Sequence, residues 1–553
     1  MKNIRFEVAA DGIALATIDM PGRPFNVFSD EMIDELDQLT VRIAGDPAVR
    51  GVVVTSGKDA FMAGADLAMV RGFTTLRLDK TADEIRAVFP RLNYALRRFE
   101  RLEVPTVAAI NGLALGGGLE FAMACHHRVA VDGGPPGLGL PEILLGLFPG
   151  AGGTQRLPRL TTPAFAARML LDGQPVSPAV AHAAGLVDHL APAAQLLDSA
   201  RAIARQARPG ARWDHAGWQA PADTEGFLDG DDVLEKLLAL AWMGPRVAHC
   251  YPAVGAVCRC LLDGRGKSID AAIEVEVENF LTIMLDAVAG NMVRTSFLSR
   301  TAAPKRAAQQ LDAADGGVRA LYVNGTAPAR FAGRFDLVDD LARADATLAV
   351  GSPGPAVRAE FAIGLRAVDA APTGCPVEIR YLGDFETVEA VEIAAAPGEL
   401  AARALAIARR LRLTPVATPP GDAGPLARLL VTARRAADAH APDAARRGAL
   451  ANALDLGALF ARAGLAHAES DGYTAADRAA GLAILRELAD EAAACLVDGL
   501  LATPDDIDVL AVTALGFPAW SGGPLSFLDM IARGEVDGLA PTPGVTPSLF
   551  YSE

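Results

Sequence analysis

The first 130 residues alternate between two hydrophobic periods, and each period predicts a type of element. Residues 13–17 alternate as in a strand, whereas residues 33–43 repeat an apolar residue every three or four positions behind Ser29, which predicts a capped helix. Apolar runs at residues 50–57 and 104–110 predict buried strands. Repeated strand and helix units of this kind predict an α/β sheet.

Beyond residue 160 the pattern changes at three places. Residues 161–310 keep mostly helical spacing, a strand pattern returns at residues 318–323, and Pro and Gly cluster at residues 413–425, where a domain boundary is expected. The remainder is helical in pattern. Its clearest helix is predicted to begin at Thr474, in capping-box spacing with the Asp three residues on, and to end near Gly499. Its inward-facing residues are predicted to be Leu482, Leu485, Leu488 and Leu496.

Length and composition narrow the class of protein. A chain of 553 residues predicts about three domains, and 51% hydrophobic with 21% charged residues is the composition of an ordinary globular protein. The net charge of −16 disfavours nucleic acid and anionic membranes as partners. Charged residues interrupt the N-terminal stretch too often for a signal peptide, and no apolar run is long enough to span a membrane, so we expect a cytoplasmic protein.

The six cysteines and eight histidines do not indicate a metal centre. They are dispersed along the chain without paired metal-ligand spacing, and the thiols are expected to be reduced. The adjacent His126 and His127 would point to opposite faces of a strand, so they would not easily share a metal. No metal site is predicted.

Three consecutive glycines stand directly before a glutamate in the apolar stretch "NGLALGGGLEFAMAC", residues 111–125. Glycines let backbone amides approach a ligand, and the first amides of a helix have no internal partner, so a helix opened at Gly116 would present free amides to a negatively charged oxygen. Glu120, in the first turn, would lie at the edge of the same pocket. A tightly packed strand-to-helix turn with Glu120 facing solvent explains the same residues equally well.

Two further segments are candidates for the same site. Glu142 follows Pro141, a residue that suits the start of a helix, and residues 61–70 form a small-residue loop whose backbone could approach a ligand. Each also has a purely structural explanation: a helix-start glutamate favoured by the helix dipole, and loop packing. The three segments in this order and spacing are far more specific than any one of them.

Together these segments resemble the enoyl-CoA hydratase/isomerase (crotonase) family. The resemblance is carried by "AGADL", "NGLALGGGLEFAMAC", "LPEILLGLFPGAGGTQRL" and "LLDGQPVSPAVAHAAGLVDHL", and it covers about residues 1–190. It implies a crotonase core of ββα spiral type, with the amides of Ala65 and Gly117 as the oxyanion hole and Glu120 and Glu142 as the catalytic pair. The residues implied to contact CoA are Ala63, Asp66, Leu67, Gly116 and Pro141.

The resemblance also implies a reaction. Relatives that act as isomerases, hydrolases or other lyases often lack one glutamate, and both are present here, which favours addition of water to a 2-enoyl-CoA thioester. In the family the counterpart of Glu142 donates the proton and that of Glu120 activates the water. Two alternatives stay open: another crotonase reaction, such as isomerisation or hydrolysis of an unusual acyl-CoA, and a non-catalytic CoA-thioester-binding or scaffolding subunit.

The continuation resembles hydratase/3-hydroxyacyl-CoA dehydrogenase fusions, the family of the α-subunit of the bacterial fatty-acid oxidation complex. Residues 277–300 resemble the linker helix, and residues 495–531 the helical repeat of the dehydrogenase. This implies, as further partners, a thiolase subunit or a second copy of the chain. The predicted division is a crotonase core at 1–190, a helical extension with the linker helix at 191–310, a degenerate Rossmann-like domain at 311–420 and a helical dehydrogenase-type domain at 421–553.

The dehydrogenase-like half lacks the features of a dinucleotide site. After the strand at residues 318–323 the chain reads "NGTAPARFAG", without the GxGxxG glycines, and residues 324–347 are too few for a helix, a second strand with its ribose-binding acid and another helix. The family's catalytic His falls on Arg380, which cannot accept a proton, although the partner acid is present as Glu392. We therefore predict no NAD binding and no cofactor, which argues against a working bifunctional enzyme.

Overall fold

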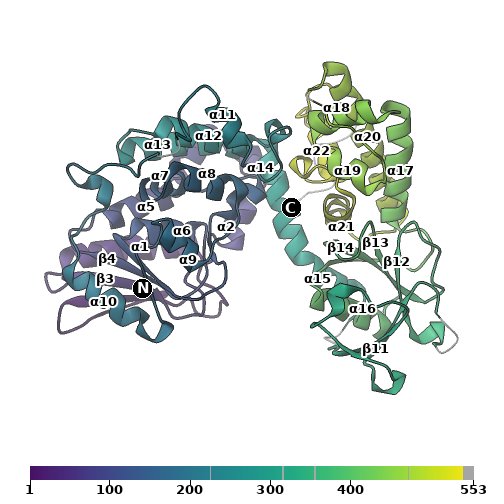
Figure 1. Cartoon of the computed structure of the whole chain (residues 1–553), viewed down its shortest axis with the longest axis horizontal. Coiled ribbons are helices and arrows are strands. Elements are labelled where there is room, and N and C mark those ends of the chain that lie inside the picture. Colours follow the sequence, from purple (N-terminus) through teal and green to yellow (C-terminus); the bar gives the residue numbers. More distant parts are fainter. Residues whose placement is uncertain (224–225, 314–316, 354–356, 471, 540–553) are drawn as a thin grey trace. The chain divides into compact units, whose positions relative to one another are not determined.

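The computed structural model describes the chain except for residues 224–225, 314–316, 354–356, 471 and 540–553. It divides into two compact units, residues 1–290 and 291–553 (Figure 1). Each unit is described by itself below. The finer division into four segments stays a prediction, and its first boundary, at residue 190, falls inside a strand of the first unit.

The first unit is built on a six-stranded sheet of order β1-β2-β3-β4-β6-β8. β1 and β2 pair antiparallel, and every other neighbouring pair is parallel, which confirms the predicted α/β sheet. Val53, Val107 and Val129 are fully buried in successive strands, because a largely parallel sheet is covered on both faces. The strands are β1 (Ile4–Val8), β2 (Ile13–Ile18), β3 (Gly51–Ser56), β4 (Thr106–Ile110), β6 (His127–Val131) and β8 (His189–Ala191); a separate small sheet pairs β5 (Ala114–Leu115) with β7 (Leu138–Gly139).

Helices cover this sheet and extend the unit away from it. The hydroxyl of Ser29 accepts a hydrogen bond from the Met32 amide at 3.2 Å, which confirms the predicted cap of the first helix. Within the unit, Figure 1 shows α7, α8, α12 and α13 gathered on one side and β3, β4 and α10 on the other. The helices are α1 (Asp30–Gly45), α2 (Leu67–Gly72), α3 (Leu76–Asp79), α4 (Ala82–Val88), α5 (Arg91–Glu100), α6 (Gly117–Ala124), α7 (Gly153–Leu160), α8 (Pro163–Asp172), α9 (Pro178–Ala183), α10 (Leu196–Gln206), α11 (Val233–Leu238), α12 (Pro252–Gly264) and α13 (Ile269–Met284).

The predicted linker helix at residues 277–300 is not one continuous helix. α13 ends at Met284, and the chain continues through α14 (Ala287–Met292), a π-helix labelled η5 (Val293–Ser299) and α15 (Arg300–Gln310). Within α15, Pro304 lacks the amide that an interior helical position would use.

The second unit contains a seven-stranded sheet of order β10-β9-β11-β12-β13-β14-β15, in which only β13 and β14 pair antiparallel. Residues 324–347 were expected to be too few for a helix, a second strand and a further helix together; they contain a short strand, β10, which pairs parallel with β9, but no α-helix. Two single-turn 3₁₀ helices replace the α-helices of the usual crossovers, which is how the strand fits into so short a segment. The strands are β9 (Ala320–Asn324), β10 (Asp336–Val338), β11 (Ala346–Val350), β12 (Ile363–Ala367), β13 (Val377–Tyr381), β14 (Ala390–Ala394) and β15 (Thr414–Thr418).

The predicted helical C-terminal region is confirmed. Thr474 and Asp477 form the predicted capping box at the start of the longest helix, with Thr474 N donating to Asp477 at 2.9 Å. Leu482, Leu485 and Leu488 are buried as expected, whereas Leu496, near the helix end, is only half-buried. The helices are α16 (Glu399–Arg410), which lies between β14 and β15 in sequence, and then α17 (Pro425–His440), α18 (Ala444–Leu454), α19 (Gly457–Arg462), α20 (Ala475–Val497), α21 (Pro504–Leu510) and α22 (Pro524–Ala532).

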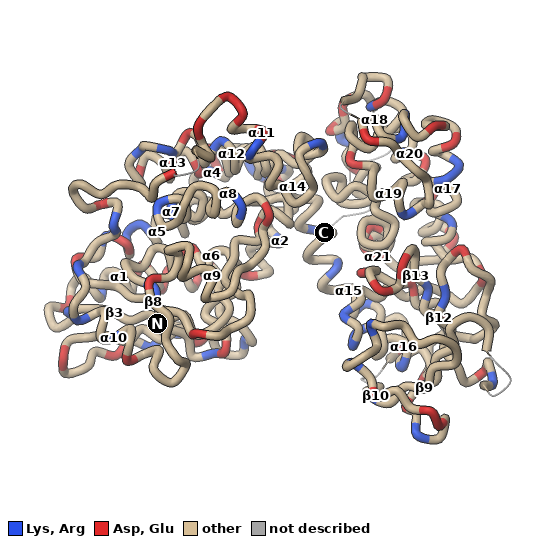
Figure 2. Tube along the Cα trace, viewed as in Figure 1, with Lys and Arg blue, Asp and Glu red and all other residues tan. Residues whose placement is uncertain are grey.

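Charged residues of both signs are distributed over the chain, and the cysteines form no disulfide, as expected for reduced thiols. Lys and Arg alternate with Asp and Glu along both units (Figure 2). All six cysteines are free thiols. In the described part of the chain, no helix combines the length and the apolar character needed to cross a bilayer.

Candidate active site

At two of the three glycines, Gly116 and Gly118, a Cβ would collide with neighbouring residues. Gly116 has φ +51°, and a Cβ there would run into the Glu142 carboxylate. A Cβ on Gly118 would strike the carbonyl of Met62, so α6 could not pack as closely against Met62. The solvent-facing alternative for Glu120 is wrong, because only 2% of this residue is exposed.

The amides of Ala65 and Gly117 are available to a ligand. Neither amide donates a hydrogen bond to any described residue. Beside Ala65, the Phe28 amide donates to the Gly64 carbonyl at 2.8 Å and the Phe28 carbonyl accepts from the Asp66 amide at 2.7 Å, so the Ala65 amide between them stays free of a protein acceptor. The two segments adjoin: a Cβ built on Gly116 would lie 3.7 Å from the Gly64 Cα. Gly117 is the first residue of α6, where the amide has no intrahelical acceptor.

Glu120 is a buried carboxyl with a fixed orientation. Its Oε1 atom accepts hydrogen bonds from the Ala151 and Gly153 amides at 2.8 and 2.7 Å. Burial raises the pKa of Glu120 to about 7, although the two amides and the Arg156 charge pull that pKa down. A carboxyl with this pKa exchanges protons at neutral pH.

Glu142 is a second buried carboxyl with a different environment. It lies in η1 (Pro141–Leu145), a 3₁₀ helix that begins at Pro141, and its Oε2 atom accepts no hydrogen bond from the described residues. Burial raises the pKa of Glu142 well above its usual value, and the negative charges of Glu120 and Glu276 raise it further. The neutral acid is therefore the favoured form of Glu142.

A third buried carboxyl, Glu276 of α13, was missed by the sequence analysis. Its two oxygens accept hydrogen bonds from the Gly152 amide at 2.6 Å, the Thr154 amide at 3.0 Å, the Thr154 hydroxyl and the Asn93 side chain at 2.9 Å. Burial and the Glu120 charge raise its pKa to about 8. The available signal was a charged residue within the apolar stripe of a helix, between Ile273 and Phe280.

Residues 151–154 thus present four consecutive amides to two carboxyls in alternation. The first and third amides bind Glu120, and the second and fourth bind Glu276. The loop is also tied by Arg156, which donates to the Ala151 carbonyl at 2.7 Å and pairs with the fully buried Glu100 at 2.8 Å. These contacts fix the backbone that orients Glu120.

The residues implied to contact CoA lie in or beside these segments, but some of their polar groups are already used. The Ala63 amide donates to the Asn26 carbonyl at 2.9 Å. Asp66 caps α2 through the Ala68 amide at 2.7 Å and pairs with Arg23. Leu67 is 51% exposed. Gly116 lies against Glu142, and Pro141 begins η1.

His126 has a structural role. Its Nδ1 atom accepts from the amides of Thr106 and Gly210, both at 3.2 Å, so Nε2 carries the proton and donates to the Glu100 carbonyl at 2.8 Å. Burial lowers the pKa of His126, which keeps the ring neutral.

In the second unit, the residues at the family's dehydrogenase positions form a buried ion pair. Arg380 of β13 stands directly opposite Glu392 of β14, and the two side chains are joined at 3.2 Å. Arg380 also contacts Glu378 at 2.9 Å. A guanidinium has no lone pair with which to accept a proton, so Arg380 offers only donors at this position.

The first unit thus combines an α/β sheet with two amides that have no acceptor among the described residues and with two carboxyls, Glu120 and Glu142, that have buried oxygens. The profile of the family described as enoyl-CoA hydratase/isomerase matches residues 9–213. This match covers the sheet of the first unit and the segments that contain Glu120 and Glu142.

Similar proteins extend this match. The chain is 36% identical over 284 residues to the fatty acid oxidation complex subunit alpha of Shewanella putrefaciens, and 38% identical over 275 residues to that of Shewanella loihica. These alignments cover 50% and 49% of this chain but only 38% and 37% of the relatives. A solved enoyl-CoA hydratase from Bacillus anthracis is 26% identical to this chain; the match covers 50% of this chain and 89% of the hydratase, with a TM-score of 0.33.

Proposed function

We propose that the first unit is an enoyl-CoA hydratase, which adds water across the 2,3 double bond of a 2-enoyl-CoA thioester. The observation that carries this proposal is the pair Glu120 and Glu142: Glu120 is buried, the Oε2 atom of the half-buried Glu142 is shielded from solvent, and their hydrogen-bonding environments differ. Hydration needs one carboxyl to activate water and one to supply a proton, and the two environments separate these tasks.

The amides of Ala65 and Gly117 would bind the thioester oxygen. As water attacks carbon 3, the electrons of the double bond move towards this oxygen, and the two donors stabilise the enolate that forms. Losing one such donor costs on the order of 3 kcal/mol of transition-state stabilisation. Both donors are backbone amides on fixed segments, so they require no rearrangement when charge develops.

The two carboxyls would then divide the proton transfers. Glu120, with two amide donors on Oε1, is the more easily ionised of the two and would take a proton from the attacking water. Glu142, with its raised pKa and no hydrogen bond to Oε2, would remain protonated and deliver its proton to carbon 2. The proton gained by Glu120 and the one lost by Glu142 balance the addition of one water.

The adenine end of CoA would lie along the backbone of residues 63–67. A second crotonase reaction, isomerisation or hydrolysis, would use the same oxyanion site and is distinguished by its product. A non-catalytic thioester-binding role would leave the retention of two desolvated carboxyls unexplained, because burying them costs stability. The thiolase partner and self-association stay predictions.

For the second unit we propose a dehydrogenase-like fold without dehydrogenase activity. The proposal is supported by the Arg380 and Glu392 ion pair, which occupies the positions of a proton-accepting pair. The turn after β9 contains one glycine, Gly325, followed by Pro328, so it lacks the successive glycines that allow a pyrophosphate to approach. These residues do not fit NAD.

The test follows the conjugated thioester absorbance of crotonyl-CoA and of a longer 2-enoyl-CoA, with mass spectrometry of the product. We expect a gain of one water, and Glu142→Gln should reduce kcat roughly a hundredfold or more. The exposed Glu103→Gln is the matched control and should leave the rate unchanged. An isomerised or hydrolysed product would refute hydration, and NADH formation on adding NAD would refute the inactive second unit.

A further inference from the structure

Four phenylalanine rings from distant parts of the first unit meet beside the loop of residues 151–154. The rings of Phe89 and Phe280 are stacked, with centroids 3.9 Å apart and an angle of 15° between their planes. Phe148 packs edge-on against Phe280 at 4.9 Å, and the Phe73 ring lies 6.3 Å from that of Phe89. Phe148 and Phe280 are buried, whereas Phe73 and Phe89 are half-buried. We call these four residues the phenylalanine cluster.

The phenylalanine cluster contacts the backbone directly before Ala151. A Cβ built on Gly150 would lie 2.7 Å from an atom of the Phe89 ring and 2.7 Å from an atom of the Phe280 ring, so both rings lie against Gly150 itself. The next residue, Ala151, donates its amide to Oε1 of Glu120 at 2.8 Å. Only one peptide unit of the loop therefore separates the two stacked rings from the group that holds the Glu120 carboxyl.

Helix α13 brings Phe280 to this loop. Phe280 follows Glu276 by four residues, so the two side chains project from the same face of the helix. Glu276 accepts from the amides of Gly152 and Thr154, and Phe280 lies against Gly150. The same helix face thus gives the loop one polar contact and one apolar contact, and the apolar contact is the phenylalanine cluster.

The cluster lies where the acyl chain of the proposed substrate would continue. The amides of Ala65 and Gly117 would bind the thioester oxygen, and Glu120 would activate the water that attacks carbon 3. Carbon 4 and the carbons beyond it therefore begin beside Glu120, where they need an apolar surface. A Cβ built on Gly117 would lie 3.6 Å from a methyl group of Leu92, and Phe89 stands just before Leu92 in sequence, so these two side chains provide such a surface.

We propose that the stacked rings of Phe89 and Phe280 close the acyl end of the site and restrict the substrate to short-chain acyl groups, with Phe89 as the specificity-determining residue. This inference rests on the hydratase function proposed above. Rings at stacking distance leave no space for a methylene chain between them, and Phe148 packs against Phe280 on the buried side. Phe89, at the end of α4, is the more exposed of the two stacked rings, so a longer chain would have to displace it.

The experiment is calorimetric titration of the full chain with butyryl-CoA and decanoyl-CoA, which are saturated thioesters and cannot be hydrated. We expect the wild type to bind decanoyl-CoA no more tightly than butyryl-CoA, although each further methylene would add about fourfold in affinity if it were buried. In Phe89→Ala, decanoyl-CoA should bind at least tenfold more tightly than in the wild type, while butyryl-CoA should bind as before. Phe89→Leu, which perturbs the fold less, should show the same change to a smaller degree.

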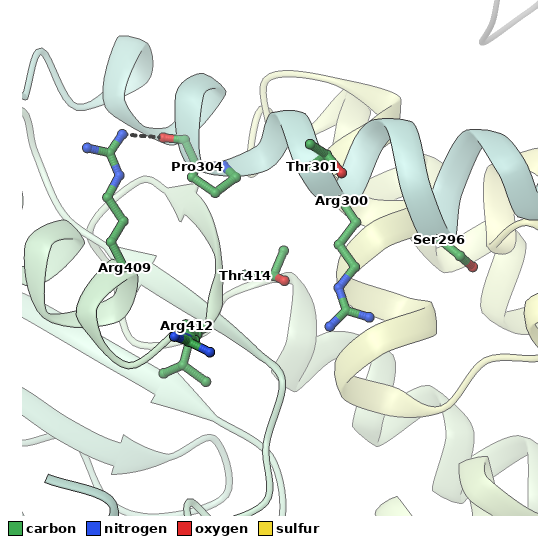
Figure 3. Close-up of a pocket in the computed structure, with 8 residues that line it drawn as sticks. Ser296, Arg300, Thr301, Pro304, Arg409, Arg412 and Thr414 are labelled. Atoms are coloured by element: carbon green, nitrogen blue, oxygen red, sulfur yellow. Dashed lines mark hydrogen bonds between the residues drawn. The ribbon is translucent and has the colours of Figure 1, made fainter. Parts of the chain in front are cut away.

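Two results would overturn the inference: a wild-type affinity that rises steadily with chain length, or an unchanged decanoyl-CoA affinity in both Phe89 variants. The expected binding pattern without hydration of crotonyl-CoA would refute the proposed function alone. Because CoA is anionic, Arg412→Gln controls for binding in the cleft of the second unit that Arg300, Arg409 and Arg412 line (Figure 3). This variant should keep both affinities; loss of acyl-CoA binding would place the ligand outside the first unit and overturn the inference as well.

Discussion

Replacing Glu276 by glutamine tests whether α13 orients the loop of residues 151–154, which holds Glu120. The carboxylate of Glu276 accepts from two backbone amides, Gly152 on one oxygen and Thr154 on the other. Glutamine has a single accepting oxygen, so whichever way its amide is placed, one of these N–H groups faces a nitrogen. A buried donor left without an acceptor costs roughly 1–3 kcal/mol.

This cost is small enough for the protein to remain folded and large enough to measure. A change of 1 kcal/mol lowers Tm by roughly 2–4 °C for a unit of this size. Because Gly152 and Thr154 alternate with the amides that hold Glu120, a shift of the loop would move Glu120 as well. A misplacement of about 1 Å costs up to roughly a hundredfold in rate, so kcat should fall by tenfold to a hundredfold.

The pH profile of kcat distinguishes a Glu276 that acts on the two proposed catalytic carboxyls from one that only stabilises the fold. The pKa of Glu276 is about 8, and once it is ionised above that pH its charge raises the pKa of Glu142; the Glu276→Gln variant should therefore move the alkaline limb of kcat to lower pH. The charged groups facing Glu276 are Glu120, Glu142 and Arg156, all unchanged in the variant. The assay is crotonyl-CoA hydration between pH 5 and 9, with melting curves at each pH.

Glu278→Gln is the matched control, since Glu278 lies on the same helix but its side chain is 52% exposed and pairs with Arg86. It should leave rate, pH profile and Tm nearly unchanged. A Glu276→Gln protein with a lower Tm but the wild-type rate and pH profile would refute the positioning role and leave Glu276 as a packing residue.

Three other variants test separate parts of the structure. The raised pKa of Glu142 gives stability that is full below about pH 4.5 and is lost as pH rises, and Glu142→Gln removes this loss. Calorimetry should therefore show a smaller drop in stability from pH 5 to pH 8 in the variant than in the wild type; an equal drop would contradict this. Gly116→Ala should lower both Tm and kcat, because its Cβ meets Glu142 at positive φ; wild-type kcat would contradict it. Thr474→Ala should cost about 1 kcal/mol in the second unit, seen as an earlier melting step, without altering hydration.

The features predicted from sequence are those with local causes. Ser29 and Thr474 each cap a helix by accepting from the amide three positions on, so spacing alone identifies them. The glycines before Glu120 indicated a backbone that another group approaches closely, and at Gly116 the carboxyl of Glu142 is such a group. The cross-strand pairing of Arg380 with Glu392 agrees with the positions assigned by resemblance.

The features that were missed depend on distant parts of the chain. Glu276 binds a loop 124 residues away from it, and no local pattern encodes that contact. β10 has three residues and is held by its parallel pairing with β9, which spacing does not reveal. The resemblance of residues 277–300 to a linker helix implied one helix, whereas α13 ends at Met284 and the backbone changes helix type at Val293.

The alternating contacts of residues 151–154 also limit where this enzyme can be divided. The family profile ends at residue 213, and Glu276 lies beyond it, on α13. A shortened chain that stops there would keep Glu120, Glu142 and the two amides proposed to bind the thioester oxygen, yet it would lose one of the two carboxyls that accept from the loop's amides. The proposed active site is therefore larger than the stretch of sequence by which the family is recognised, and we expect that a minimal active fragment needs α13.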